Sequence, residues 1–108
     1  MSATFRLQIV SPEAVVWSGE AEMLVTRTSE GEIGILAGHE PTMAALATGS
    51  TVVHAAGGET VTVAIHGGFL QIAGDEVMLL TDRAVLAEGD ADEARELARA
   101  MASEEDGG

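Results

Sequence analysis

The sequence predicts a mostly β domain, a sandwich or flattened barrel, followed by one short C-terminal helix. Short segments in which apolar and polar residues alternate recur about every ten residues, and turns rich in glycine separate them. About eight to ten such segments are present, which is typical of a sandwich or barrel. At Asp90 the apolar period changes from two to that of a helix. With 108 residues and a hydrophobic fraction of 46%, the chain can bury one ordinary core.

The first strand is expected at 4–10, where Phe5, Leu7 and Ile9 lie on one face and polar residues lie on the other. Turn-forming residues at 11–13 end it. Further strands are expected at 14–18, 21–28, 50–56, 60–66, 69–73, 76–81 and 84–87.

The stretch 29–41 departs from this alternation. It carries Gly31, Gly34 and Gly38 among apolar and acidic residues. Each glycine inside a strand costs ~0.5–1 kcal/mol in lost conformational freedom. We therefore expect a shaped, rigid turn region here rather than a buried strand. The next segment, 41–48, is short and apolar, and its alanines would also permit a helical turn.

One helix is predicted at the C-terminus. Asp90, with Glu93 three residues later, fits a capping box in which aspartate takes the serine role. A helix of about twelve residues would be about 18 Å long and only marginally stable alone. The expected organisation is a β-sandwich domain at 1–88, the helix at 89–103 and an acidic, disordered tail at 104–108.

The charge of the chain excludes several kinds of partner. Its net charge is −13, and five basic residues face eighteen acidic ones. Such a surface repels nucleic acid and anionic lipid and favours contact with basic protein surfaces. The chain has no cysteine, and neither a signal peptide nor a membrane-spanning run is evident. A cytoplasmic protein is expected, or one peripheral to something that is not cytoplasmic.

No pattern in the sequence indicates catalysis, a bound cofactor or a metal site. His39, His54 and His66 are far apart in the chain and fall on different predicted elements. A small metal-dependent barrel enzyme of cupin type that uses these histidines remains as an alternative. The glycines of 29–41 are not followed by the lysine and helix of a phosphate-binding loop. The residues favour a non-catalytic module that works through its surfaces.

The stretch from Glu30 to Pro41, Glu-Gly-Glu-Ile-Gly-Ile-Leu-Ala-Gly-His-Glu-Pro, closely resembles the signature of the epsilon subunit of the F-type ATP synthase. Other segments match the family in the same order, and the resemblance covers about 4–98. They are Phe5 to Glu13, Leu46 with Gly49, His66-Gly67-Gly68-Phe69 and Val77 to Thr81.

This resemblance implies a ten-stranded β-sandwich with a helical C-terminal part. It implies a non-catalytic subunit of the rotating central stalk, which joins the gamma subunit to the membrane ring of c subunits and couples proton flow to ATP synthesis. The subunit would lie at the cytoplasmic face of the cell membrane, held there only through the complex. The partner interface with the c ring or gamma would include Glu30, Glu32, Gly34, His39 and Pro41, while the apolar residues of the stretch would point inward.

The sequence departs from the family pattern in several places. Ala37 stands where the family often has proline. After Asp90 there is room for only one of the two usual helices, so a short form with weak or absent inhibition of ATP hydrolysis is expected. Asp92 and Arg95 match part of an ATP-binding motif, but Glu96 replaces its alanine. A free regulatory module that binds ATP through Asp92 and Arg95 is the other alternative.

Overall fold

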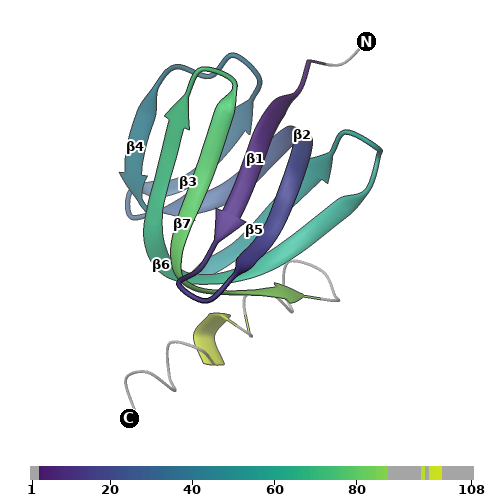
Figure 1. Ribbon diagram of the computed structural model, residues 1–108. Helices are drawn as coiled ribbons and strands as arrows, with labels where there is room; N and C mark the ends of the chain where they lie inside the picture. Colours follow the sequence, from purple (N-terminus) through teal and green to yellow (C-terminus); the bar gives the residue numbers. More distant parts are fainter. Residues whose placement is uncertain (1–2, 88–95, 97, 101–108) are drawn as a thin grey trace.

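The computed structural model describes residues 3–87, 96 and 98–100 of the chain. Seven strands form one hydrogen-bonded sheet that folds over on itself into a two-layered sandwich (Figure 1). The strands are β1 (Phe5–Val10), β2 (Val15–Thr28), β3 (Gly31–Leu36), β4 (Thr42–Ala45), β5 (Gly49–Ala55), β6 (Thr60–Ala73) and β7 (Glu76–Ala87).

The first strand closes the sheet. β1 pairs with β2 in the antiparallel sense and with β7 in the parallel sense. The strands β7, β6, β5 and β2 follow one another in the hydrogen-bonded order, so β1 completes a ring. β3 extends this ring from β2, and β4 extends it from β6.

Long, bent strands connect the two layers. β2 and β6 have 14 residues each and β7 has 12. The beginning of β2 pairs with β1, and its end pairs with β3 and β5. The prediction of a mostly β sandwich is confirmed, but the expectation of about ten short strands is wrong. In β2 and β6, pairs of predicted strands are fused because pairing continues past glycines at which breaks are expected. In β7 the fusion runs through Asp82 and Arg83, because pairing with β6 continues there.

Gly67 and Gly68 show how β6 bends without ending. Both have positive φ, 73° and 122°, a conformation that side chains with a Cβ rarely adopt. A Cβ at Gly68 would also collide with the carbonyl oxygen of Leu80 on β7. The glycines allow β6 to turn toward the other layer while it keeps its pairing with β7.

The stretch 29–41 contains a strand, so the expectation of a turn region throughout is wrong. Ile33 and Ile35 alternate inward on β3, and Ile35 is fully buried. Gly34 faces outward, so it leaves no gap in the core. The helical turn considered for 41–48 is also wrong, since Thr42–Ala45 forms β4 against β6.

The core lies between the two layers and is built almost entirely from aliphatic side chains. Its fully buried members alternate along their strands, as the predicted half-buried strands require. The largest are Leu7, Ile9, Leu24, Ile35, Val53, Val63, Ile65, Leu70 and Leu79.

Part of the predicted C-terminal helix is described. Residues 96 and 98–100 are helical. Ala98 is fully buried against Ala64 of β6, and Ala87 packs beside them. The rest of 89–103 and the tail at 104–108 lie outside the described residues, so the predicted domain boundaries stay predictions. Within the described part of the chain, no helix is long and apolar enough to cross a membrane.

Replacing Gly68 by alanine should destabilise the fold. The substitution combines a positive φ, which costs about 1–3 kcal/mol, with a collision against the backbone of β7. Urea unfolding should therefore show a loss of at least about 2 kcal/mol. Gly57→Ala is the matched control, because a Cβ there meets nothing within 4 Å. An equal effect of both substitutions would contradict this account of the bend.

Thr26 and Thr51 should stabilise the core as a pair. Their hydroxyl oxygens are 2.7 Å apart and both side chains are buried. Thr26→Val leaves the Thr51 hydroxyl buried without its partner, which should cost about 1–3 kcal/mol in urea unfolding. The double variant Thr26→Val/Thr51→Val should lose less than the sum of the two single variants. Strict additivity would show that the hydroxyl pair contributes nothing.

Candidate functional site

An exposed row of apolar side chains crosses one face of the sandwich. Ala45 of β4, Phe69 of β6 and Leu80 of β7 are neighbours in register, and Val10 of β1 and Val15 of β2 continue the row. At about 4.8 Å between strands, the row is about 19 Å long. We call these residues the apolar row.

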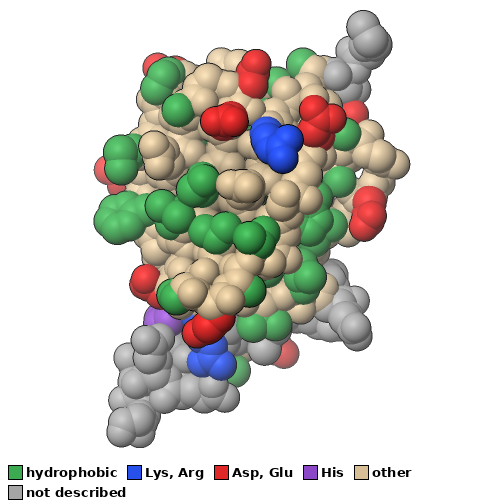
Figure 2. Space-filling model, viewed as in Figure 1, with side chains coloured by type: hydrophobic (Ala, Val, Ile, Leu, Met, Phe, Trp, Pro, Cys, Tyr) green, Lys and Arg blue, Asp and Glu red, His purple; other side chains and the backbone are tan. Residues whose placement is uncertain are grey.

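Most side chains of this row are exposed to solvent, while Val10 is half-buried. Phe69 is 55% exposed, Val15 60% and Leu80 43%. Met43 of β4, two residues before Ala45, is 73% exposed and adds to the same face. Figure 2 shows the hydrophobic side chains as a band across this face, viewed as in Figure 1. Contiguous exposed apolar area of this kind marks a contact surface for another protein.

Polar and charged residues border the apolar row on one side. Two residues away along the strands, Gln71, Met78 and Gln8 form a second row in register. Beyond it lie Glu76 and Arg6, which are register neighbours on β7 and β1. The face therefore has an apolar centre and a polar border, as protein interfaces have.

A hollow lies on a different part of the surface from the apolar row. It is lined by Arg27 of β2, Glu32 of β3, Thr48, Ser50 of β5 and Arg99, among others. Arg27 and Glu32 are register neighbours. The helical residue Arg99 and the predicted interface residue Glu32 therefore line the same hollow.

The structure separates the predicted interface residues into two groups. Glu30 lies in the turn before β3, and Glu32 is exposed near the beginning of that strand. His39 and Pro41 lie beyond its other end, before β4. The six residues of β3 span about 17 Å, so the two groups lie at opposite ends of the strand.

Within these groups the individual contacts are local. Gly34 lies between them on β3 and faces outward. The His39 ring nitrogen Nδ1 lies 2.9 Å from the carbonyl oxygen of Glu40, and the hydroxyl of Thr42 donates to the same oxygen. Their role in a partner interface stays a prediction.

The metal-enzyme alternative finds no support in the described part of the chain. His54 is exposed on β5, and Nδ1 of His66 lies 2.9 Å from the Thr48 hydroxyl, while His39 lies in the loop before β4. Among the described residues, no three His, Asp or Glu side chains lie close enough to hold a metal ion. Asp92 and Arg95, the candidate ATP-binding residues, lie outside the described residues, so their role stays a prediction.

Sequence reasoning missed the apolar row. The signal for it was present in β7, where Val77 to Leu80 are all apolar, although a half-buried strand should alternate. Val77 and Leu79 are buried, which leaves Met78 and Leu80 on the outer face. A strand that is apolar on both faces of a two-layered sandwich predicts an outer surface covered by a partner.

Comparison with known proteins agrees with this fold. The family model described as ATP synthase, Delta/Epsilon chain, beta-sandwich domain matches residues 4–87. An ATP synthase epsilon chain of Streptomyces avermitilis is 43% identical over 104 residues, covering 94% of this chain and 84% of that protein. The epsilon chain of Frankia casuarinae is 43% identical over 81 residues, covering 75% of this chain and 95% of the relative.

Solved structures of ATP synthases contain similar chains. One from the mitochondrial ATP synthase of Euglena gracilis, in a structure of OSCP, F1 and the c-ring, matches with a TM-score of 0.74 and 32% identity. That match covers 95% of this chain and 67% of the other. One from the Tetrahymena thermophila central stalk and c-ring has a TM-score of 0.61 at 11% identity, covering 95% and 92%, and shows the fold alone. From the match to the family model and the identity to its relatives, the chain belongs to the ATP synthase delta/epsilon chain family.

Proposed function

We propose that this chain is a non-catalytic subunit of the rotating central stalk, joining the gamma subunit to the c ring at the cytoplasmic face of the cell membrane. The observation that carries the proposal is the apolar row on the outside of a closed sandwich. A free-standing domain of this size gains nothing from exposing Phe69 and Leu80 side by side. A subunit that is permanently covered by a partner gains binding energy, because the partner buries these side chains.

The gamma subunit is the partner we assign to the apolar row. A coupling between two rotating parts needs one interface that does not dissociate under load, and burial of apolar area supplies it. His39 and Pro41 lie immediately before β4, whose Met43 is part of this face. This end of β3 is therefore assigned to the gamma side.

The opposite end of β3 is assigned to the c ring. Glu30 and Glu32 are both exposed there, and basic groups on the loops of the ring would complement them. The hollow that holds Glu32 also contains Arg27 and Arg99, so acidic groups of the ring find partners in the same place. Two ends with different chemistry let one small domain contact two proteins.

The closed sheet suits this mechanical task. Each strand of the ring is hydrogen-bonded on both sides, and the interior is filled by interlocking aliphatic side chains. Packed interiors have low compressibility, so a force applied at one surface reaches the other with little deformation. The proposal assigns no bond chemistry to any residue.

Changing the apolar row should weaken binding to gamma. Phe69→Ser removes the exposed aromatic side chain of the row, and loss of such a contact costs about 2 kcal/mol, or about 30-fold in Kd. Calorimetric titration with the purified gamma subunit of the same organism measures this. Leu86→Ser is the control, because Leu86 is 47% exposed near the end of β7, outside the row and away from the end of β3 assigned to gamma. Equal affinities of both variants, or no binding by the unaltered protein, would contradict the assignment.

Reversing the charge at Glu32 should weaken attachment to the c ring. Glu32→Arg replaces an exposed acid near the β2–β3 turn, and loss of an exposed ion pair is worth up to about fivefold in affinity. Retention of the chain on reconstituted enzyme, measured against salt concentration, should fall most at low salt because screening hides such pairs. Glu59→Arg, in the β5–β6 turn, should leave retention unchanged. Equal losses for both variants would mean that only net charge matters.

A further inference from the structure

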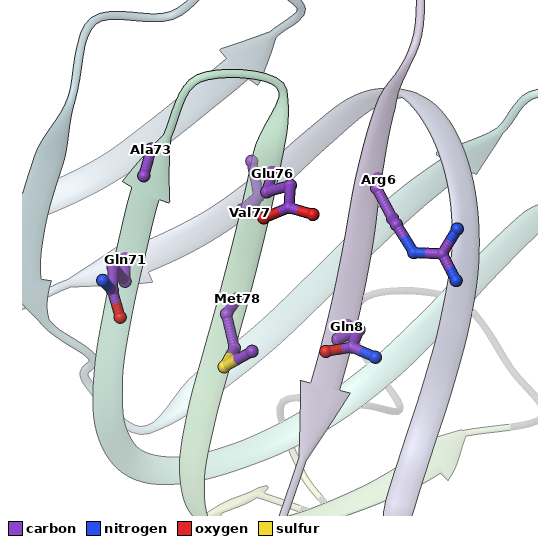
Figure 3. Close-up of a pocket in the computed structure, with 7 residues that line it drawn as sticks. All are labelled: Arg6, Gln8, Gln71, Ala73, Glu76, Val77 and Met78. Carbon is purple, nitrogen blue, oxygen red and sulfur yellow. The ribbon is translucent and has the colours of Figure 1, made fainter.

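A shallow pocket opens on the same face as the apolar row. It has a volume of about 230 Å³ and is lined by side chains of β1, β6 and β7 (Figure 3). Met78, which lines it, and Leu80, which belongs to the apolar row, are alternate residues of β7 and so point to the same face about 7 Å apart. The pocket and the apolar row therefore form one continuous surface.

The pocket exists because a small residue lies beside a charged one. Ala73 of β6 is the register neighbour of Glu76, and its methyl group is too short to cover the carboxylate. Figure 3 shows the side chains of Glu76 and Met78 on β7, with Met78 further along the strand. Gln71 and Gln8 lie on either side of Met78 in register. The lining thus combines a carboxylate, two amides, a thioether and the side chain of Arg6.

The charges around the pocket are predominantly negative. Arg6 is the β1 register neighbour of Glu76, but it is equally the register neighbour of Glu20 on β2. Figure 3 shows the Arg6 guanidinium directed away from Glu76, toward β2. Asp75 precedes Glu76 in the β6–β7 turn and is also exposed. The lining itself thus holds one arginine and one carboxylate, while Glu20 and Asp75 lie just outside it and the whole chain carries a net charge of −13.

We propose that this pocket receives one arginine or lysine side chain of the protein that covers the apolar row. The aliphatic stem of such a side chain would lie on Met78, and its cationic head would donate to the Glu76 carboxylate and the amide oxygens of Gln8 and Gln71. The inference rests on the proposed function, because it presumes that the gamma subunit is the covering protein. It adds a polar contact that fixes the register of an otherwise apolar interface.

A contact of this kind has a distinct physical role. Apolar surfaces attract without regard to direction, so the apolar row alone would permit gamma to slide across the sheet. A charged head enclosed by a carboxylate and two amides has a single favourable position. Once gamma covers the pocket, the pair is shielded from water and its loss is more costly than loss of an exposed pair.

The test is titration of variants with the purified gamma subunit. Glu76→Gln keeps the shape of the side chain and removes its charge, and should raise Kd about tenfold and flatten its dependence on salt. Ala73→Leu changes no charge but fills the pocket, and should weaken binding as well. Asp75→Asn is the matched control, because it removes the adjacent negative charge outside the pocket lining and should change Kd less than about twofold.

Several outcomes would overturn the proposal. Equal effects of Glu76→Gln and Asp75→Asn would show that the partner senses only overall charge. Weaker binding by Arg6→Gln together with unchanged or tighter binding by Glu76→Gln would show that the pocket receives an acidic side chain instead. If Phe69→Ser weakens gamma binding while Glu76→Gln and Ala73→Leu do not, this inference fails and the proposed function stands. If the unaltered chain does not bind gamma, the proposed function itself fails.

Discussion

The parallel pairing of β1 with β7 is the constraint on which the rest of the surface depends. β1 closes the ring by pairing with β2 on its other side, and this buries Leu7 and Ile9 completely. The same register brings Val10 beside Leu80 and Arg6 beside Glu76. A slip by one residue would exchange the faces of β1 and destroy the core, the apolar row and the pocket together. Burial of the core side chains therefore fixes the strand register, and the register also determines which side chains are neighbours on the outer surface.

The outer surface carries two kinds of contact because adjacent rows of side chains differ in chemistry. Along β7, Leu80, Met78 and Glu76 point to the same face and change from aliphatic to thioether to carboxylate. Strength of binding and accuracy of position thus come from neighbouring rows of the same strands. A subunit that couples two rotating parts needs both strong binding and a fixed position. If the interface could slide, rotation of one part would not be transmitted fully to the other.

The sequence predicted the existence of the strands better than their ends. β1 and β5 lie where alternation placed them, within about a residue. The sequence pattern predicts strand ends at Gly19 and Gly67-Gly68, yet Gly19 pairs with Leu7 and pairing between β6 and β7 continues past the two glycines. A glycine ends a strand only if hydrogen bonding stops there, and that depends on neighbours distant in sequence. The candidate interface residues came from family resemblance. The apolar run Val77 to Leu80 indicates an apolar outer face on β7, but the other members of the row depend on the register between strands, which no local pattern reveals.

The length of β3 determines how the stretch from Glu30 to Pro41 can contact partner proteins. Taken as one loop, Glu30 through Pro41 would present all its polar residues to a single partner. As a strand of about 17 Å with a turn at each end, it holds Glu30 and His39 too far apart for one small contact. The strand between Glu30 and His39 is packed against the core through Ile33 and Ile35, so its two ends stay at a fixed separation. Under the proposed function, a stretch so fixed presents its two ends to two partners at a constant separation, as a domain between the gamma subunit and the c ring requires.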